Sequence, residues 1–465
     1  MPVAPVAFGV QMKIFRRKNA PIIFPIVFFV SIIFLGSIIL HFSEQSNESA
    51  LSWIDSIFTA TSAACVTGLV VVDTGSYFSM LGKTVILCLM QVGGLGIMTF
   101  TSLSIYLWRR RTSITDRIAI GQALSYETGF NLGRFLVEIV CWTFFIEICG
   151  AALLMLFAPG NFTVFSAIFH SVSAFCNAGF SLFSTSLVGL KGDWGVNLVF
   201  IILIFSGGIG FSVFIDIKNS IRKKFWKSMA AYKKGLNWYT RTVLHTSLFL
   251  ILYGWLALYI AEYVSYNRII PMDDAVLTSL FQSVTARTAG FNSLDIGSLT
   301  NVSLVVLLFL MFIGGAPGSC AGGIKVTTFR VLVATIWSQL RGRKQVVIGK
   351  YAVSQTDVKK SMVLFLLAIS IIFTAVFLLD FTEGGDLPHY QVRGQFLEIL
   401  FEAVSAFCTV GLSTGLTSIL SVAGKWIIIL LMLIGRLGPF VLITALQSIQ
   451  EDQMYRLPEE KVMIG

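Results

Sequence analysis

The sequence predicts an all-α polytopic membrane protein made of four similar repeats, each with two long helices and a short re-entrant helix between them. Three observations carry this prediction. The 465 residues are 55% hydrophobic and only 12% charged, with a mean hydropathy of +0.82. Eight segments are apolar over the roughly 20 residues that a membrane-crossing helix needs. One short glycine-containing stretch recurs four times at nearly constant spacing.

The eight apolar segments lie at 21–41, 81–107, 135–157, 196–215, 243–264, 303–339, 361–380 and 425–447. So much apolar sequence with so little charge is not the composition of a soluble globular protein. The first segment is too long for a cleaved secretory signal, and no small-residue cleavage site follows it. We therefore expect it to remain as the first span.

Positive charge is distributed unevenly among the connections. The two ends of the chain and the connections after the second, fourth and sixth spans hold 25 Lys and Arg residues, whereas the other connections hold five. The positive-inside rule then places both termini and every even-numbered connection in the cytoplasm. We therefore predict a multi-pass protein of the cytoplasmic membrane. A nucleic-acid-binding surface would be the other explanation of these charges, but topology explains them better, so we expect no nucleic-acid partner.

The seven cysteines lie in apolar surroundings without a C-x-x-C pair, and the four histidines are scattered. Neither a structural zinc site nor a disulfide framework is therefore predicted.

The recurring stretch reads TSAACVTGL (61–69), VSAFCNAGF (172–180), SVTARTAGF (283–291) and VSAFCTVGL (404–412). Its glycines are separated by 111, 111 and 121 residues. Each copy stands between two long spans and follows about a dozen apolar residues, which are too few to cross a bilayer but suit a re-entrant helix. The sequence therefore divides into repeats at 21–111, 130–220, 241–345 and 358–450, with cytoplasmic ends at 1–20 and 451–465.

The repeated glycine turn has a physical purpose in a membrane. Non-helical backbone at membrane depth is tolerated only where it is buried in protein or lines a water-filled path. A glycine accepts positive φ and lets neighbouring carbonyls turn toward a common axis, where four turns would replace part of a cation's hydration shell. The carboxyl ends of the short helices would add partial negative charge. A single loop of this kind would be an ordinary turn, but four in register predict a pseudo-fourfold pore.

The sixth span is interrupted by GGAPGSCAGG (314–323), which holds five glycines and one proline. Each glycine lowers helix propensity by about 1 kcal/mol and proline by about 3 kcal/mol, so the helix must break here. The stretch lacks the G-K-[ST] ending of a phosphate-binding loop. We predict an unwound segment that lines the cavity below the glycine turns. A kink for close helix packing is the simpler alternative.

Charged residues inside the spans are candidates for the ion path. Arg436, in the last span, should face the interior beside the broken segment, because a central charge costs about 2.5–3.5 kcal/mol in lipid. A salt bridge with Glu147 of the third span is the alternative. Lys325 follows the broken segment and is expected to extend to the cytoplasm. Glu138 and Asp216 are expected near span ends as solvated or capping groups.

Arg287 stands where the other three copies have a cysteine. A cation facing the ion path would repel a passing cation. We therefore expect a structural role in which the guanidinium donates to carbonyls at the end of the short helix. A charge that tunes conductance is the alternative.

These features resemble the Trk/Ktr/HKT superfamily of potassium transporters, whose subunit is one polypeptide of four M1–pore loop–M2 units. The resemblance covers nearly the whole chain, and GRLGP (435–439) in the last span is more similar to the Ktr-type membrane subunit than to the Trk type. The resemblance implies potassium uptake, often assisted by sodium, by a protein that is not an enzyme and needs no organic cofactor. A Trk-type transporter is the alternative within the superfamily.

The resemblance also assigns sites. Potassium would bind at the carbonyls of a selectivity filter formed by Val66, Thr67, Gly68, Asn177, Ala178, Gly179, Thr288, Ala289, Gly290, Thr409, Val410 and Gly411. An intramembrane gate would comprise Gly314, Gly315, Pro317, Gly318, Ser319, Gly322, Gly323, Lys325 and Arg436.

The implied partners are membrane lipid, a second copy of the chain in a homodimer, and a cytosolic nucleotide-binding regulatory subunit of the RCK type. The basic cytoplasmic connections are too short for a folded domain, and anionic lipid headgroups would explain their charges equally well. From a different class, a proton-coupled secondary transporter or an intramembrane enzyme would use Glu138, Glu147 and Asp216. Glycine turns rather than carboxylates recur in the four repeats, which argues against both.

Overall fold

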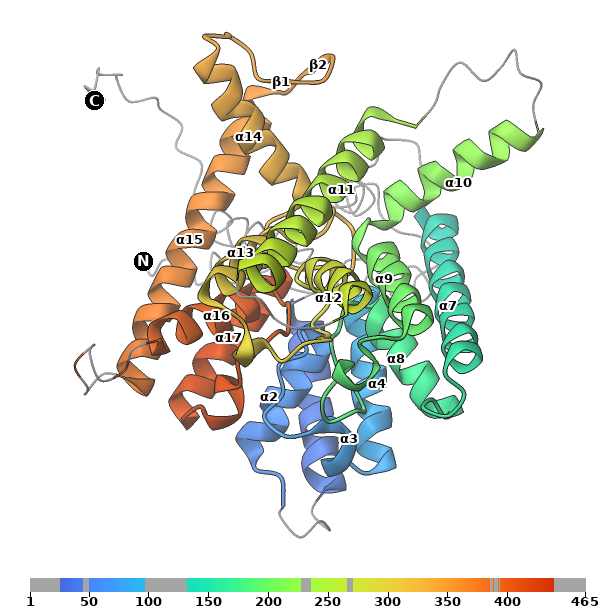
Figure 1. Cartoon of the computed structure of the whole chain (residues 1–465), viewed down its shortest axis with the longest axis vertical. Coiled ribbons are helices and arrows are strands. Elements are labelled where there is room, and N and C mark those ends of the chain that lie inside the picture. Colours follow the sequence, from blue (N-terminus) through green and yellow to red (C-terminus); the bar gives the residue numbers. More distant parts are fainter. Residues whose placement is uncertain are drawn as a thin grey trace, which may run out of the picture.

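The structure is a computed structural model that describes residues 26–44, 50–96, 132–226, 236–265, 271–384, 388, 392 and 394–438. Within this part of the chain, regular structure is helical apart from one two-stranded hairpin. Figure 1 shows long helices around a centre where shorter helices meet.

The first two repeats follow the expected order of a long helix, a short helix, a loop and a further helix. The first repeat contains the helix Ile26–Ser43, α2 (Trp53–Ala64), the short α3 (Thr74–Tyr77) and α4 (Met80–Gly94). The second contains α7 (Leu132–Phe157), α8 (Val164–Phe175), a 3₁₀ turn η1 (Val188–Leu190), α9 (Trp194–Gly208) and α10 (Phe211–Trp226).

The last two repeats keep this order, with an interruption in the third. That repeat contains α11 (Trp238–Tyr259) with a π-helical turn η3 (Ile260–Ser265), α12 (Met272–Thr285), η4 (Ile296–Ser298), α13 (Asn301–Phe312), α14 (Val326–Leu340) and the hairpin β1 (Val347–Ile348) and β2 (Tyr351–Ala352). The fourth contains α15 (Gln355–Glu383), α16 (Gln395–Phe407), η5 (Leu416–Ile419) and α17 (Val422–Leu437).

Among the described residues, four single helices are long and apolar enough to cross a membrane. They coincide with the first, third, fifth and seventh predicted spans: Ile26–Ser43, Leu136–Phe157, Trp238–Val264 and Gln355–Glu383. The prediction of one continuous helix at 196–215 is wrong, because α9 and α10 meet at an angle of 103°. Gly210, at the break, has φ +85°, which ends a helix readily. The second and eighth spans are described only through α4 and α17, so residues 97–107 and 439–447 of the prediction lie outside the described part. The full count of eight spans and four re-entrant helices stays a prediction.

The short helices α2, α8, α12 and α16 are 12 to 14 residues long. Two of them begin at a hydroxyl cap, since the side chain of Ser52 accepts from the Asp55 N–H and that of Thr163 from the Ser166 N–H. All four are heavily buried and end toward the middle of the molecule. Figure 1 shows α12 near this centre.

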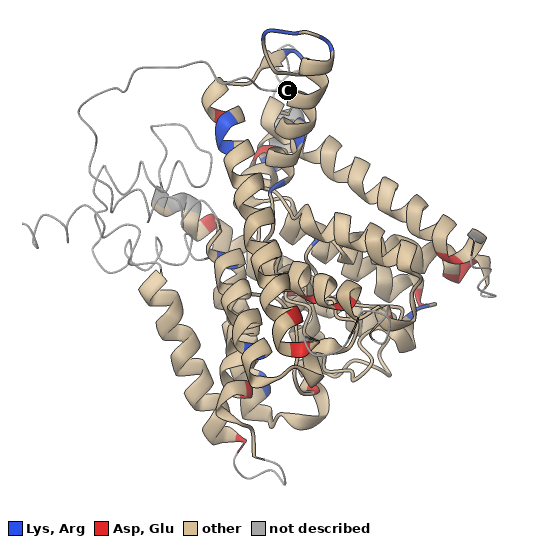
Figure 2. Ribbon diagram, turned by 90° about the vertical axis from the view of Figure 1, so that its left-hand side faces the viewer, with Lys and Arg blue, Asp and Glu red and all other residues tan. Residues whose placement is uncertain are grey.

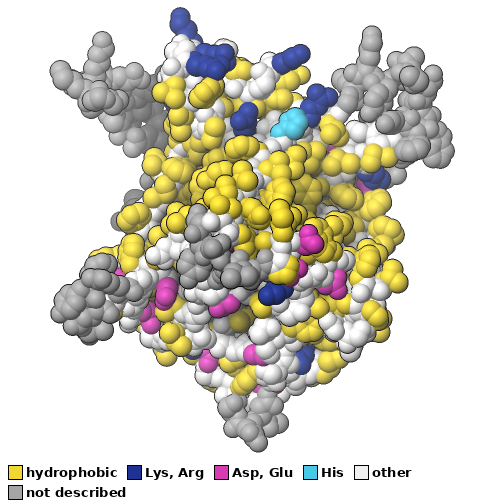
Figure 3. All heavy atoms as spheres, in the orientation of Figure 1, with side chains coloured by type: hydrophobic (Ala, Val, Ile, Leu, Met, Phe, Trp, Pro, Cys, Tyr) yellow, Lys and Arg dark blue, Asp and Glu magenta, His cyan; other side chains and the backbone are white. Residues whose placement is uncertain are grey.

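The core surrounds these short helices. Phe58, Phe169 and Phe401, which share one position in three repeats, are fully buried, while Leu280 in the third repeat is partly buried. The outer helices instead expose apolar side chains: Phe373, Phe377 and Phe381 on α15 are at least 72% exposed. Figure 3 shows this apolar surface as a broad band, with most visible Lys and Arg near the end that carries the hairpin. In Figure 2, charged residues are sparse along the long helices. A bilayer around the band is the environment that such a surface requires.

Candidate functional site: a ring of four glycine loops

Each short helix is followed by a loop with the same backbone conformation. The residue two positions before the repeat glycine has positive φ in all four loops: Val66 (56°), Asn177 (58°), Thr288 (69°) and Thr409 (50°). The glycines follow with φ between +71° and +93°. Positive φ at a β-branched residue is a strained conformation that costs about 1–3 kcal/mol and concentrates at functional sites. Three of the four residues, Val66, Thr288 and Thr409, are β-branched, and positive φ recurs in all four loops, which indicates that the loop shape serves a shared purpose.

The four glycines touch one another in a closed ring. A β-carbon on Gly68 would lie 2.9 Å from the Cα of Gly179, and one on Gly179 would lie 2.9 Å from the Cα of Gly290. A β-carbon on Gly290 would lie 3.4 Å from the Cα of Gly411, and one on Gly411 would return to the Cα of Gly68 at 2.9 Å. Four loops far apart in sequence therefore surround one axis, in the order of the repeats.

Carbonyl oxygens lie within the same ring. The added β-carbon on each glycine would contact the carbonyl of the residue that precedes the neighbouring glycine; these residues are Ala178, Ala289, Val410 and Thr67. The twelve residues assigned to the filter from the sequence are thus brought together from four repeats. Potassium binding at these carbonyls stays a prediction.

The loops are held from behind by their own short helices. Ser62 and Ser405 accept hydrogen bonds from the N–H groups of Gly68 and Gly411, both at 3.1 Å. The Ser173 hydroxyl donates to the carbonyl of Phe180 at 2.8 Å, and Thr285 does the same to Phe291 at 2.6 Å. These bonds join each loop to its own short helix and so fix the conformation of the loop.

Several buried hydroxyls of the ring find no partner among the described residues: Thr67, Thr288 and Thr409. A buried polar atom without a partner is costly, and such atoms often face a site that water or an ion occupies. Their presence in three of the four loops fits a hydrated or ion-occupied path.

Residues 313–325, between α13 and α14, form a folded-back loop rather than a helix, as the glycine content predicts. Ile313 and Ile324 bridge its two ends. The loop contacts the break between α9 and α10, because the N–H groups of Ala316 and Cys320 donate to the carbonyls of Gly208 and Gly207 at 2.9 and 3.1 Å. On the other side, a β-carbon on Gly322 would collide with the Thr409 side chain, and one on Gly323 would lie 3.3 Å from the Cβ of Cys408. The loop therefore packs directly against the fourth glycine loop.

Arg436 and Lys325 bind this loop. The two Nη groups of Arg436 donate to the carbonyl of Cys320 in the loop and to that of Gly93 at the end of α4. Lys325 does not extend away as expected, since its ammonium folds back to the carbonyl of Ala321 at 2.6 Å. Both cations thereby hold backbone carbonyls that the broken helix leaves without intrahelical partners.

Arg287 also donates to carbonyls, but not to those at the end of its own short helix. Its Nη1 donates to Ser247 of α11 at 3.1 Å and its Nη2 to Gly314 of the broken segment at 3.0 Å. The expected structural role is present with different partners. Arg287 thus connects the third glycine loop to the segment 313–325.

The similarity of this chain to known proteins matches that architecture. The model of the TrkH family, described as cation transport protein, matches residues 8–456. The chain belongs to the TrkH family. Potassium uptake protein B of the Ktr system from Bacillus subtilis (strain 168) is 37% identical over 455 residues, which cover 97% of both chains. The protein of the same name from Vibrio alginolyticus is 38% identical over 442 residues, which cover 93% of this chain and 92% of the relative.

Other relatives extend the comparison. The potassium/sodium uptake protein NtpJ of Enterococcus hirae is 32% identical over 467 residues, which cover 98% of this chain and all of the relative. The crystal structure of the potassium transporter TrkH from Vibrio parahaemolyticus superimposes with a TM-score of 0.68 over 90% of this chain and 84% of that one. At 21% identity this likeness concerns the fold. The predicted superfamily is confirmed, and the TrkH family consists of membrane ion transporters rather than enzymes.

Three carboxylates considered for a different mechanism are bound to protein groups in this TrkH-family chain. Glu138 pairs with Lys218, and Asp216 accepts from the N–H and the side-chain amide of Asn237, both at 3.0 Å. Glu147 accepts from Gln91 at 3.1 Å instead of pairing with Arg436. The alternative of an Arg436–Glu147 salt bridge is therefore wrong in this structure.

A further set of glycines was not predicted to matter. β-Carbons on Gly93, Gly207 and Gly435 would collide with the last carbonyls of three short helices, at Ala64, Phe175 and Phe407. Only glycine allows the second long helix of a repeat to pack this closely behind its loop. The similar runs GGLG (93–96), GGIG (207–210) and GRLG (435–438) could have revealed these positions as a second repeat in the sequence.

Proposed function

We propose that the protein conducts potassium into the cell through the ring of glycine loops, with the twelve filter residues presenting carbonyl oxygens to a partly dehydrated ion. The closed ring of Gly68, Gly179, Gly290 and Gly411 is the observation that carries this proposal. Carbonyl rings replace the hydration shell of potassium in selective pores. The relatives named potassium uptake proteins and NtpJ, named a potassium/sodium uptake protein, support potassium as the cargo with a sodium influence.

We further propose that the segment 313–325 gates this path. It packs against the fourth glycine loop. Arg287 holds the carbonyl of Gly314 near its start, and Arg436 holds that of Cys320 in its middle. A kink made only for packing would not need cationic side chains on its carbonyls. Shortening 314–323 is expected to raise rubidium flux in the closed state, and unchanged flux would favour the packing kink.

Charge supports the proposed orientation, and the Ktr-type relatives support the proposed partners. The basic hairpin end is proposed to face the cytoplasm, with both termini on that side. The chain would work as a Ktr-type homodimer in the cytoplasmic membrane, beneath which an RCK-type nucleotide-binding subunit docks. The two potassium uptake proteins B at 37% and 38% identity support the Ktr branch over the Trk branch.

Rubidium and sodium uptake by the purified protein in liposomes tests the function, with and without candidate cytosolic subunits. Saturable rubidium flux that exceeds sodium flux is expected. Flux that is driven by a proton gradient and depends on Glu138, Glu147 or Asp216 would instead support the secondary-transporter alternative. A protein that binds but does not pass rubidium would contradict the pore.

A further inference from the structure

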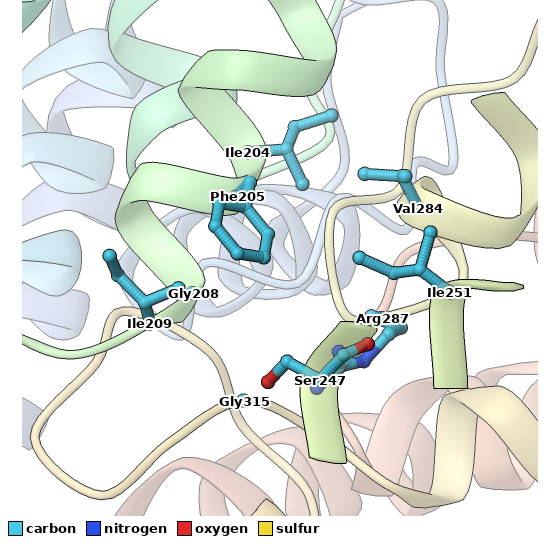
Figure 4. A pocket seen from close by; sticks show the side chains of 9 residues that line it. All are labelled: Ile204, Phe205, Gly208, Ile209, Ser247, Ile251, Val284, Arg287 and Gly315. Atoms are coloured by element: carbon cyan, nitrogen blue, oxygen red, sulfur yellow. The ribbon is translucent and has the colours of Figure 1, made fainter. Parts of the chain in front are cut away.

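A small cavity lies beside the third glycine loop, with a volume of about 20 Å³. It is bounded by α9, α11, the end of α12 and Gly315 of the broken segment. A single water needs roughly 10–15 Å³, so the space holds one water or one monatomic ion. Figure 4 shows Arg287, Ser247 and Gly315 together on one side of the cavity and apolar side chains such as Ile204 and Val284 on the other.

Arg287 lines this cavity with an unused donor. The residue is 8% exposed, and its two Nη groups donate to the carbonyls of Ser247 and Gly314. Its Nε–H has no partner among the described residues. Buried N–H groups are nearly always satisfied, so the free donor calls for an acceptor in the adjoining space.

The charge of Arg287 is also uncompensated. The ion pairs within the described part of the chain join Lys218 to Glu138 and Lys425 to Asp55, and Arg287 takes part in neither. The carbonyl partners of Arg287 are neutral, and the carboxyl end of α12 supplies only about half of a negative charge. Buried charges in proteins are normally paired with a counter-charge. An unpaired positive charge beside a cation path is especially unfavourable, because it repels the transported cation.

These conditions select the chemistry of the occupant. The positive charge of the guanidinium repels a cation. A phosphate or a carboxylate group is larger than the cavity, which has room for one water or one monatomic ion. A water would satisfy the Nε–H but leave the charge unpaired. A weakly hydrated monatomic anion satisfies both, and it tolerates apolar walls such as Phe205 and Ile251.

We propose that the cavity binds one chloride ion, which accepts from the Nε–H of Arg287 with the hydroxyl of Ser247 on the same wall. The ion would neutralise the one cationic position among the four glycine loops. Since Gly315 borders the cavity, the ion would also brace the third loop against the broken segment. Its effect on flux rests on the proposed pore function, whereas its binding does not.

Bromide, which scatters anomalously, is the probe for this site. Crystals of the full-length protein in bromide are expected to show an anomalous peak in the cavity at hydrogen-bonding distance from Arg287 Nε. Arg287→Gln should abolish the peak, Ser247→Ala should weaken it, and Arg330→Gln, which removes a charge on α14, should leave it unchanged. If Arg287→Gln does not fold, the parent protein and Ser247→Ala still decide the question. A cavity that holds only water in bromide would overturn the proposal.

A separate measurement addresses the role of the ion. Rubidium flux in liposomes should fall when methanesulfonate, too large for the cavity, replaces chloride, and bromide should restore it. Arg287→Gln should remove this anion dependence, and Arg330→Gln should retain it. If no rubidium passes under any condition, the pore function fails while the crystallographic peak still supports the anion site. Flux with the same rate in both anions would refute the proposed neutralisation.

Discussion

Glu383, in the last turn of α15, accepts two hydrogen bonds from Ser421, the residue that caps the start of α17. The Ser421 N–H donates to one carboxylate oxygen at 3.1 Å and its hydroxyl to the other at 2.6 Å. In the first and third repeats, Glu44 likewise accepts from the N–H and the hydroxyl of Ser79, and Glu262 from those of Thr300. In three repeats, a carboxylate thus joins the end of the first long helix to the beginning of the helix that follows the glycine loop.

Removal of this link in the fourth repeat should destabilise the protein. Glu383→Ala deletes both acceptors, and hydrogen bonds to a charged group contribute about 1.5–3 kcal/mol. Glu383→Gln keeps one acceptor oxygen and should lose less. Thermal unfolding in detergent measures both variants. Asp380→Ala, an exposed carboxylate on the same helix, is the control, and an equal effect of all three variants would contradict the role of Glu383.

The ring of glycines predicts the outcome of a substitution at Gly290. The residue has φ +79°, and a β-carbon there would lie 2.5 Å from the carbonyl oxygen of Val410. Gly290→Ser must therefore spread the ring. A loss of about 1.4 kcal/mol in the preference for rubidium over sodium corresponds to a tenfold lower selectivity ratio. We expect the rubidium-to-sodium flux ratio to fall by that order while protein abundance stays normal. Gly189→Ser, at a glycine with open space around it, is the control. An unchanged ratio would remove the filter assignment.

Arg436 should not be replaceable by lysine. Its planar guanidinium reaches two carbonyls at once, those of Cys320 and Gly93, whereas an ammonium acts as a single compact charge. Arg436→Lys and Arg436→Gln are therefore both expected to loosen the segment 313–325. Closed-state rubidium leak in liposomes should rise by roughly tenfold, which corresponds to one lost charge-assisted bond of about 1.5 kcal/mol. Arg341→Lys on the exposed end of α14 serves as the control. If Arg436→Lys leaks no more rubidium than the parent protein, a positive charge alone is sufficient to hold the segment 313–325.

The sequence contains enough information for some of these features and not for others. Glycine marks where a backbone departs from a helix. The sequence alone therefore predicts the four glycine loops and the glycine-rich break at 314–323. The 103° bend at Gly208–Gly210 was missed because the apolar run continues through it. The partners of Arg287 were also missed, and Lys325 was expected to extend to the cytoplasm, because the sequence does not show which backbone carbonyl a cationic side chain reaches.

The ion pair between Asp55 and Lys425 joins the first repeat to the last. The Lys425 ammonium lies 2.7 Å from the carboxylate, and the two side chains are 14% and 19% exposed. A double-mutant cycle with Asp55→Asn and Lys425→Gln should give a coupling energy of about 1 kcal/mol, at the upper end for surface pairs. The more exposed pair Lys218–Glu138 provides the comparison and should give a smaller coupling energy. Equal coupling energies would show that the first pair does not help to close the ring of repeats.

Asp73, in the loop after the first glycine turn, makes stability depend on pH. Burial acts to raise its pKa, but hydrogen bonds from Ser184, Gly75 and Ser76 outweigh burial, so the net pKa is lowered. A lowered pKa in the folded state contributes stability above the unfolded value of about 3.9, and this contribution is lost as the pH falls through the folded pKa. Asp73→Asn should therefore unfold at a lower temperature than the parent at pH 7, and the difference should shrink below about pH 4. Ser184→Ala, which removes the bond from the second repeat, should show part of the same effect. A difference that is constant from pH 7 to pH 3 would mean that the Asp73 charge contributes nothing to the contact between these loops.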